Sequence, residues 1–158
     1  MKNEILIRRS ELQQQIDLRN YYMGESAKRK DIDADTIQSS KDEKELLLMF
    51  ATQAANGLVT AVALRFPYIA CEVEDDYISF TFSSTDDSRS HLLPMLQQAL
   101  TDYLVNEMTM QWLLLRQPQM AQTYISLRNT LYSNVQHLFA KFYNQNRVRR
   151  RSTNLAGI

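Results

Sequence analysis

The longest regular pattern in the chain is a stripe of large apolar residues at steps of 4, 3, 4, 4, 3 and 4. This is the spacing of one face of an α-helix. The stripe consists of Met120, Tyr124, Leu127, Leu131, Val135, Leu138 and Phe142. Pro118 suits the first turn of a helix, so we predict a helix from there to about residue 143. With only three glycines and three prolines in 158 residues, the composition favours long regular elements.

A helix before Pro118 is indicated by a broad apolar face. The face consists of Leu93, Leu96, Leu100, Tyr103, Leu104, Met108 and Trp112. Ser88 or Ser90 is placed to cap its first turn.

Another helix is predicted between Ser40 and Pro67. Ser40 and Glu43 have the spacing of a capping box, in which each side chain satisfies a free backbone N–H of the first turn. Pro67 ends the helix because proline disfavours helical geometry in the residue before it. The apolar residues at helical spacing are Leu47, Phe50, Ala54, Leu58, Ala61 and Val62.

A β-hairpin over residues 68–82 follows, because the apolar period changes from helical to alternating. The alternating residues are Ile69, Cys71, Val73, Ile78, Phe80 and Phe82. The acidic residues between them (Glu72, Glu74, Asp75 and Asp76) predict a solvated turn. Cys71, the only cysteine, is expected to be a buried and unreactive thiol.

The N-terminal stretch from residue 3 to Met23 also has helical spacing, with Ile5, Leu12 and Ile16 on one face and Gly24 as the stop. Residues 25–39 mix both charge signs and are predicted to be a connector. The expected fold is therefore mainly α: a bundle of about four helices, with one hairpin inserted between the second and third helices. Residues 1–143 form a single domain in this prediction, and residues 144–158 form an extended basic C-terminal arm.

Charge is divided unevenly along a chain whose net charge is zero. Residues 1–107 contain 11 Lys/Arg and 18 Asp/Glu, whereas residues 108–158 contain 7 Lys/Arg and no acidic residue. Glu107 is the last carboxylate side chain. Such asymmetry suggests an interaction surface for a polyanion or for the acidic part of another copy.

No pattern typical of catalysis or of a metal site is present. His91 and His137 are the only histidines, and neither has a second ligand at the spacing that a metal requires. The glycines are too scattered for a phosphate loop. We therefore predict no enzyme activity, no cofactor and no metal. The charged start of the chain is unlike a signal peptide, and its apolar runs are too short for a membrane span.

The C-terminal arm is the one feature that a solvated surface does not explain well. Its arginines follow a long apolar helix directly, and two apolar residues near its end can anchor in a groove. The predicted partner-binding residues are Arg147, Arg149, Arg150, Arg151, Leu155 and Ile158.

The order of two helices, a hairpin, two helices and a basic arm resembles the head–tail connector (adaptor) proteins of tailed bacteriophages. The resemblance is carried by residues 100–151, from "LTDYLVNEMTMQWLLLRQPQM" through the second helix to the arginine exit. It implies a structural virion protein, assembled in the host cytoplasm, that forms a ring under the portal. Its implied partners are the portal protein, other neck or tail proteins and further copies of itself, with twelve copies in the ring. DNA passing through the channel could meet scattered arginines without sequence readout.

Two functions stay open from the sequence. The first is the adaptor, for which a tail terminator or another neck ring protein is the nearest variant. The second is a cytoplasmic helical regulator that binds nucleic acid through the arginine-rich tail, which predicts salt-sensitive DNA binding.

Overall fold

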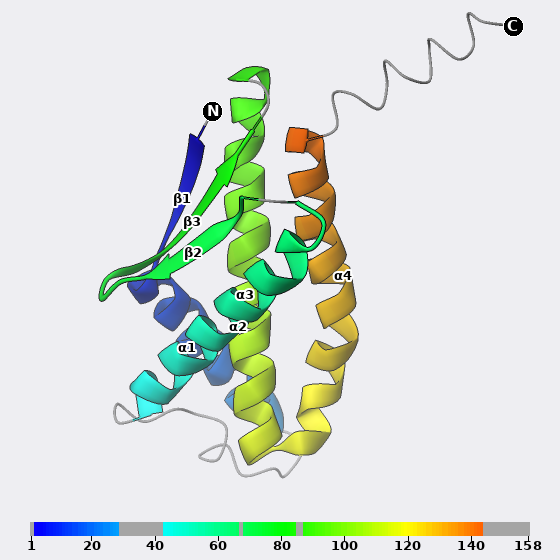
Figure 1. Ribbon diagram of the computed structural model, residues 1–158. Helices are drawn as coiled ribbons and strands as arrows, with labels where there is room; N and C mark the ends of the chain where they lie inside the picture. The colour runs from blue at the N-terminus through cyan, green and yellow to red at the C-terminus, as the bar shows by residue number, and fades with distance from the viewer. Residues whose placement is uncertain (1, 29–42, 67, 85–86, 144–158) are drawn as a thin grey trace, which may run out of the picture.

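A computed structural model describes residues 2–28, 43–66, 68–84 and 87–143 (Figure 1). The fold is mainly helical, with four α-helices and a small antiparallel sheet, as the sequence predicts. Several predictions lie outside the described residues: residues 29–39 of the predicted connector 25–39, Ser40, Pro67 and the arm 144–158.

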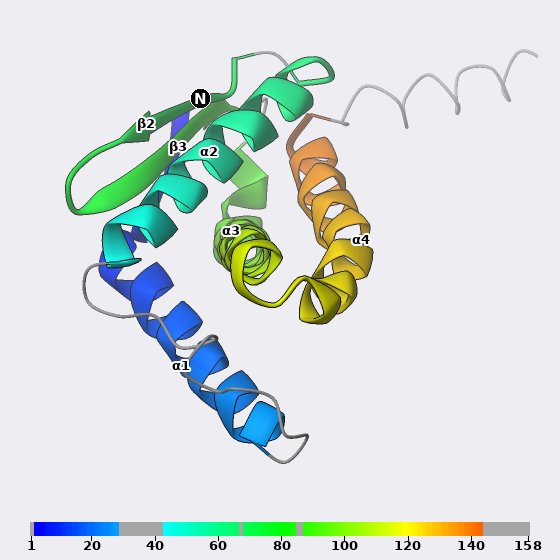
Figure 2. The same ribbon diagram turned by 90° about the horizontal axis from the view of Figure 1, so that it is seen from below.

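Helices α3 (Leu93–Arg116) and α4 (Pro118–Tyr143) form an antiparallel pair, and Pro118 begins α4 as predicted. The stripe of α4 is buried toward its C-terminal end, at Val135, Leu138 and Phe142, whereas Leu127 is 41% exposed. Helix α3 is central: α4, α2 and α1 surround it (Figure 2).

The start of α3 differs from the prediction. A short 3₁₀-helix, Asp87–Leu92, precedes it, and Leu92 is the N-cap residue without a side-chain cap hydrogen bond. The predicted serine cap is therefore wrong. Pro94 lies in the first turn, where its missing N–H removes one of the donors that a cap would satisfy.

Helix α2 (Lys44–Ala63) buries Leu47, Phe50, Leu58 and Val62, as predicted. Its N-cap is Glu43, which makes no side-chain cap hydrogen bond and instead forms an ion pair with Arg116 of α3. The role of Glu43 in a capping box is therefore wrong, because the carboxylate is used between helices.

By length and composition, α2 is the one described helix that could cross a membrane. Six of its residues are buried against the rest of the protein, however: Leu47, Phe50, Ala51, Ala55, Leu58 and Val62. Core packing accounts for much of its apolar character.

The predicted hairpin is confirmed as β2 (Ala70–Val73) and β3 (Tyr77–Ser83), which pair antiparallel. A third strand, β1 (Lys2–Arg8), pairs antiparallel with the other side of β3, so the strand order is β1-β3-β2. The prediction that residues 3–8 are helical is therefore wrong. Their side chains alternate: Ile5 and Ile7 are buried, and the residues on either side are more exposed.

Helix α1 (Arg9–Lys28) begins where β1 ends. It buries Leu12 and Ile16 as predicted. Gly24 is buried within the helix and does not stop it, so the predicted C-terminus is wrong by about one turn. Residues 25–28, predicted to belong to the connector, are helical. In Figure 2, α1 and α4 lie on different sides of α3.

An aromatic cluster joins the sheet to the end of α4. The ring of Phe82 on β3 contacts Phe139 at 5.3 Å and Phe142 at 5.1 Å between centroids, both edge to face. Phe66, just after α2, stacks on Tyr143 at 5.3 Å. The last turn of α4 is therefore fixed to β3 and to the end of α2.

Candidate partner-binding surfaces

The predicted partner-binding residues all lie outside the described residues: Arg147, Arg149, Arg150, Arg151, Leu155 and Ile158. The structure does describe the residue that precedes the predicted arm. Tyr143, the last residue of α4, is held by its stacking on Phe66 and by a hydrogen bond with the backbone of Ser83, whereas burial raises the pKa of its hydroxyl. Tyr143, the residue before the predicted arm, is therefore held at a well-packed point beside the end of the sheet.

The acidic turn between β2 and β3 is exposed, as predicted, and its backbone is held from the side of β1. Arg9 donates through Nη1 to the carbonyl oxygens of Glu74 (3.1 Å) and Asp75 (3.2 Å). The backbone N–H of Arg9 donates to the carbonyl oxygen of Asp76 at 2.9 Å. Because these contacts use backbone oxygens, the carboxylates of the turn are available to a partner.

Strand β2 forms one edge of the sheet and carries part of this negative charge. Glu72 and Glu74 are exposed, whereas Cys71 is half-buried. Burial, and secondarily the nearby Glu72 carboxylate, raise the pKa of the Cys71 thiol above 9.0. The thiol is therefore largely protonated at neutral pH, and it is less buried than the sequence predicts.

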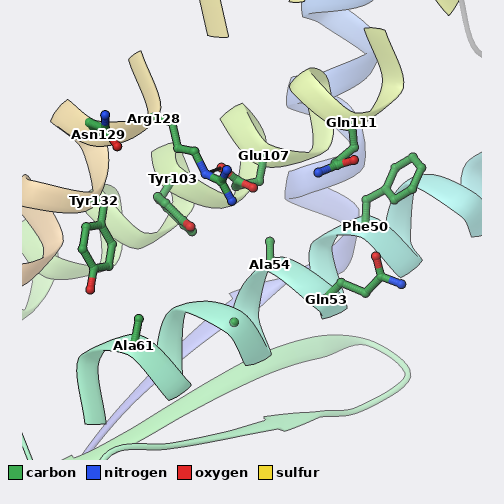
Figure 3. A pocket seen from close by; sticks show the side chains of 11 residues that line it. Phe50, Gln53, Ala54, Ala61, Tyr103, Glu107, Gln111, Arg128, Asn129 and Tyr132 are labelled. Atoms are coloured by element: carbon green, nitrogen blue, oxygen red, sulfur yellow. Dashed lines mark ion pairs between the residues drawn. The ribbon is translucent and has the colours of Figure 1, made fainter. Parts of the chain in front are cut away.

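A pocket of about 410 Å³ lies between α2, α3 and α4 (Figure 3). Small residues of α2, namely Ala54, Gly57 and Ala61, form one wall. A Cβ atom added at Gly57 would meet nothing within 4 Å, so the space beside this wall is open.

The opposite wall of the pocket contains an ion pair. Glu107 of α3 is 3% exposed, and its Oε1 lies 2.7 Å from Nε of Arg128 on α4, whose side chain is 47% exposed. Burial raises the pKa of the Glu107 carboxyl, and Arg128 partly offsets this effect. Tyr103 lies on the same wall, and its pKa is raised by burial and by Glu107. The pair links α3 to α4 at a cost in desolvation.

Replacing Glu107 by glutamine is expected to change how stability depends on pH. A carboxyl group with a raised pKa in the folded state binds its proton more tightly there than in the unfolded chain. The contribution of Glu107 to the wild-type free energy of unfolding therefore falls as pH rises from about 4.5 toward the folded-state pKa. Glutamine does not titrate, so the free energy of unfolding of the variant rises relative to that of the wild type over that pH interval.

Urea unfolding across this pH range measures the difference. The control is Glu45→Gln, which removes an exposed carboxylate from α2. If the difference between wild type and Glu107→Gln did not change with pH, titration of Glu107 would not be coupled to folding.

A second hollow, of about 590 Å³, lies between α3 and α4. Its apolar lining includes Met95, Ala99, Leu131 and Leu138, and its polar lining includes His137. Like His91, His137 is exposed. Among the described residues, no group of three or more His, Cys, Asp or Glu side chains is placed to hold a metal ion.

The sequence did not indicate the Glu107–Arg128 pair. The available signal was the place of Glu107 four residues after Tyr103 and directly before Met108, on the apolar side of the helix, a position that charged residues rarely occupy without a partner. Comparisons of the chain with protein families, with characterised proteins and with solved structures return no match.

Proposed function

We propose that this chain is a structural subunit of the ring that joins the portal of a tailed bacteriophage to its tail. The observation that carries the proposal is the aromatic anchoring of Tyr143 and Phe142 at the end of α4. An arm that binds a partner can fix the position of the subunit only if the arm is firmly attached to the folded body. Here the arm begins at a point fixed to α2 and to the sheet.

The distribution of charge supports a contact between proteins. Beyond Glu107, Arg116 forms an ion pair with Glu43, and Arg128 forms one with Glu107. The described part of α4 thus has no run of cations that would track a nucleic-acid backbone. The acidic turn after β2 and the basic arm can set the orientation of neighbouring subunits.

In this proposal Leu155 and Ile158 anchor the arm on the portal, and its arginines hold carboxylates bidentately. Removing residues 152–158 is expected to weaken assembly with the portal while leaving the body folded. Burying a Leu or Ile side chain contributes about 1.5–3 kcal/mol, so each anchor lost weakens binding by roughly tenfold or more.

Particle imaging and native mass spectrometry of the full chain mixed with the portal protein of its own phage test this. The full chain should form rings with the portal, twelve-fold by the resemblance. The chain ending at Arg151 should form no rings with the portal, although its melting temperature should equal that of the full chain. Equal assembly by both chains would show that the last seven residues are dispensable. If the full chain bound DNA at low salt and formed no complex with the portal, the nucleic-acid regulator would be the better function.

A further inference from the structure

Strand β2 has an unpaired side whose geometry is defined by its partner β3. The backbone N–H of Glu74 donates to the carbonyl oxygen of Tyr77 at 2.9 Å, and Glu72 and Ser79 are opposite each other in the same register. Hydrogen bonding alternates along antiparallel strands, so the backbone N–H and C=O groups of Cys71 and Val73 point away from β3. Within the described ranges, the sheet has no strand beyond β2. Such an edge can accept another strand.

The side chains along this edge alternate in character. Glu72 and Glu74 lie on one face of the sheet and are exposed, while Cys71 and Val73 lie on the other face, which is partly covered. At the base of the arm, Arg147, Arg149 and Arg151 stand at every second position with Val148 and Arg150 between them, so charged and apolar residues alternate over residues 147–149. In an extended strand the first three would share one face.

We propose that residues 147–151 of one copy add to β2 of a neighbouring copy as a fourth, antiparallel strand. The inference rests on the proposed function, because it identifies a contact between subunits of the ring. Residues 152–158 take no part in this contact and can bind the portal. The register that places charge opposite charge is Arg147 with Glu74, Val148 with Val73, Arg149 with Glu72, Arg150 with Cys71, and Arg151 with Ala70.

The antiparallel direction is the reason for assigning the strand to a second copy. The arm begins at Tyr143, which stacks on Phe66 and bonds the backbone of Ser83, close to the Ala70 end of β2. A chain's own arm would enter the edge there and run parallel to β2, which is the slightly less stable arrangement. A neighbour's arm can enter from the acidic turn. It also makes the heterologous contact that a ring repeats.

Cys71 provides a direct test because it is the only cysteine in the chain. In the proposed register an Arg150→Cys substitution places a second thiol opposite it. The Cα atoms of a directly bonded antiparallel pair are about 5.5 Å apart, within the range that a disulfide spans. Arg150 does not share the face of Glu72 and Glu74, so the paired charges are kept. The matched control is Thr153→Cys, which lies beyond β2 in the same register.

The experiment is mild oxidation of the full-length chain without the portal, followed by denaturing electrophoresis and peptide mass spectrometry. Arg150→Cys should give covalent oligomers linked from Cys71 to position 150, increasing with protein concentration, and Thr153→Cys should give few. A mixture of the wild type with an isotope-labelled Cys71→Ser/Arg150→Cys chain should give the mixed dimer. A bond within one chain, or no Cys71–150 bond above the Thr153→Cys level at any concentration, would overturn the proposal.

Charge reversal provides a second readout. Glu72→Arg with Glu74→Arg should reduce the Cys71–150 product to the level of the Thr153→Cys control. Arg147→Glu with Arg149→Glu on the incoming arm should restore it. Failure of this restoration would contradict the register. Because the portal is absent and residues 152–158 are retained, these results are separate from those of the truncation, and either proposal can fail alone.

Discussion

Replacing Phe82 by alanine is expected to lower the free energy of unfolding by about 3–5 kcal/mol. The side chain is 1% exposed, and its ring contacts Phe139 and Phe142 edge to face. The substitution removes a large buried surface, and α4 and the sheet cannot close the cavity completely because other contacts hold both. Urea unfolding followed by circular dichroism measures the change.

The control for Phe82→Ala is Tyr22→Ala. Tyr22 is also aromatic but is 64% exposed on α1, so its replacement should change the free energy of unfolding by no more than about 0.5 kcal/mol. If the free energy of unfolding fell by similar amounts in the two variants, the aromatic cluster would not be the contact that holds α4 to the sheet.

Replacing Ile7 by aspartate is expected to cost more than about 4 kcal/mol, which is enough to unfold most of the protein. Ile7 is fully buried and lies opposite Ile78 in the pairing of β1 with β3. A carboxylate at this position has to be desolvated among apolar side chains. Thermal unfolding and amide hydrogen exchange in β3 would both report the loss.

Leu6→Asp is the matched variant for Ile7→Asp. Leu6 is the preceding residue of the same strand, is 45% exposed and lies on the other face, because side chains alternate along a strand. It should fold with a melting temperature close to that of the wild type. Similar effects at both positions would contradict the strand assignment of residues 2–8.

The sequence predicted the elements whose signals are local. The period of 3.6 and two prolines were sufficient for α2, α3 and α4, and the change to alternation was sufficient for the hairpin. For β1 the sequence pattern is ambiguous, because Ile5 has helical spacing to Leu12 and Ile16 but strand spacing to Ile7. Seven residues do not decide between these periods. Its partner, β3, lies far along the chain, so pairing could not be inferred locally.

The misassigned caps and the unforeseen ion pair have a related physical cause. By its spacing from Ser40, Glu43 suits a capping box. In the structure its carboxylate instead forms an ion pair with Arg116 of another helix. Arg128 reaches Glu107 only because α3 and α4 pack antiparallel in one particular register. In both cases contacts between distant elements determine the role of a charged side chain. The spacing of residues along one helix gives no information about such contacts.

The position of β1 has a consequence for synthesis of the chain. Lys2 pairs with Ser83, so β1 cannot complete its pairing with β3 until the chain has been made as far as Ser83, 81 residues after Lys2. At about 5–20 residues per second, this takes roughly 4–16 s. During that time the apolar run of Ile5, Leu6 and Ile7 is exposed but is flanked by charges. The charged residues Lys2, Glu4 and Arg8 make pairing with a similar strand of another nascent chain less favourable.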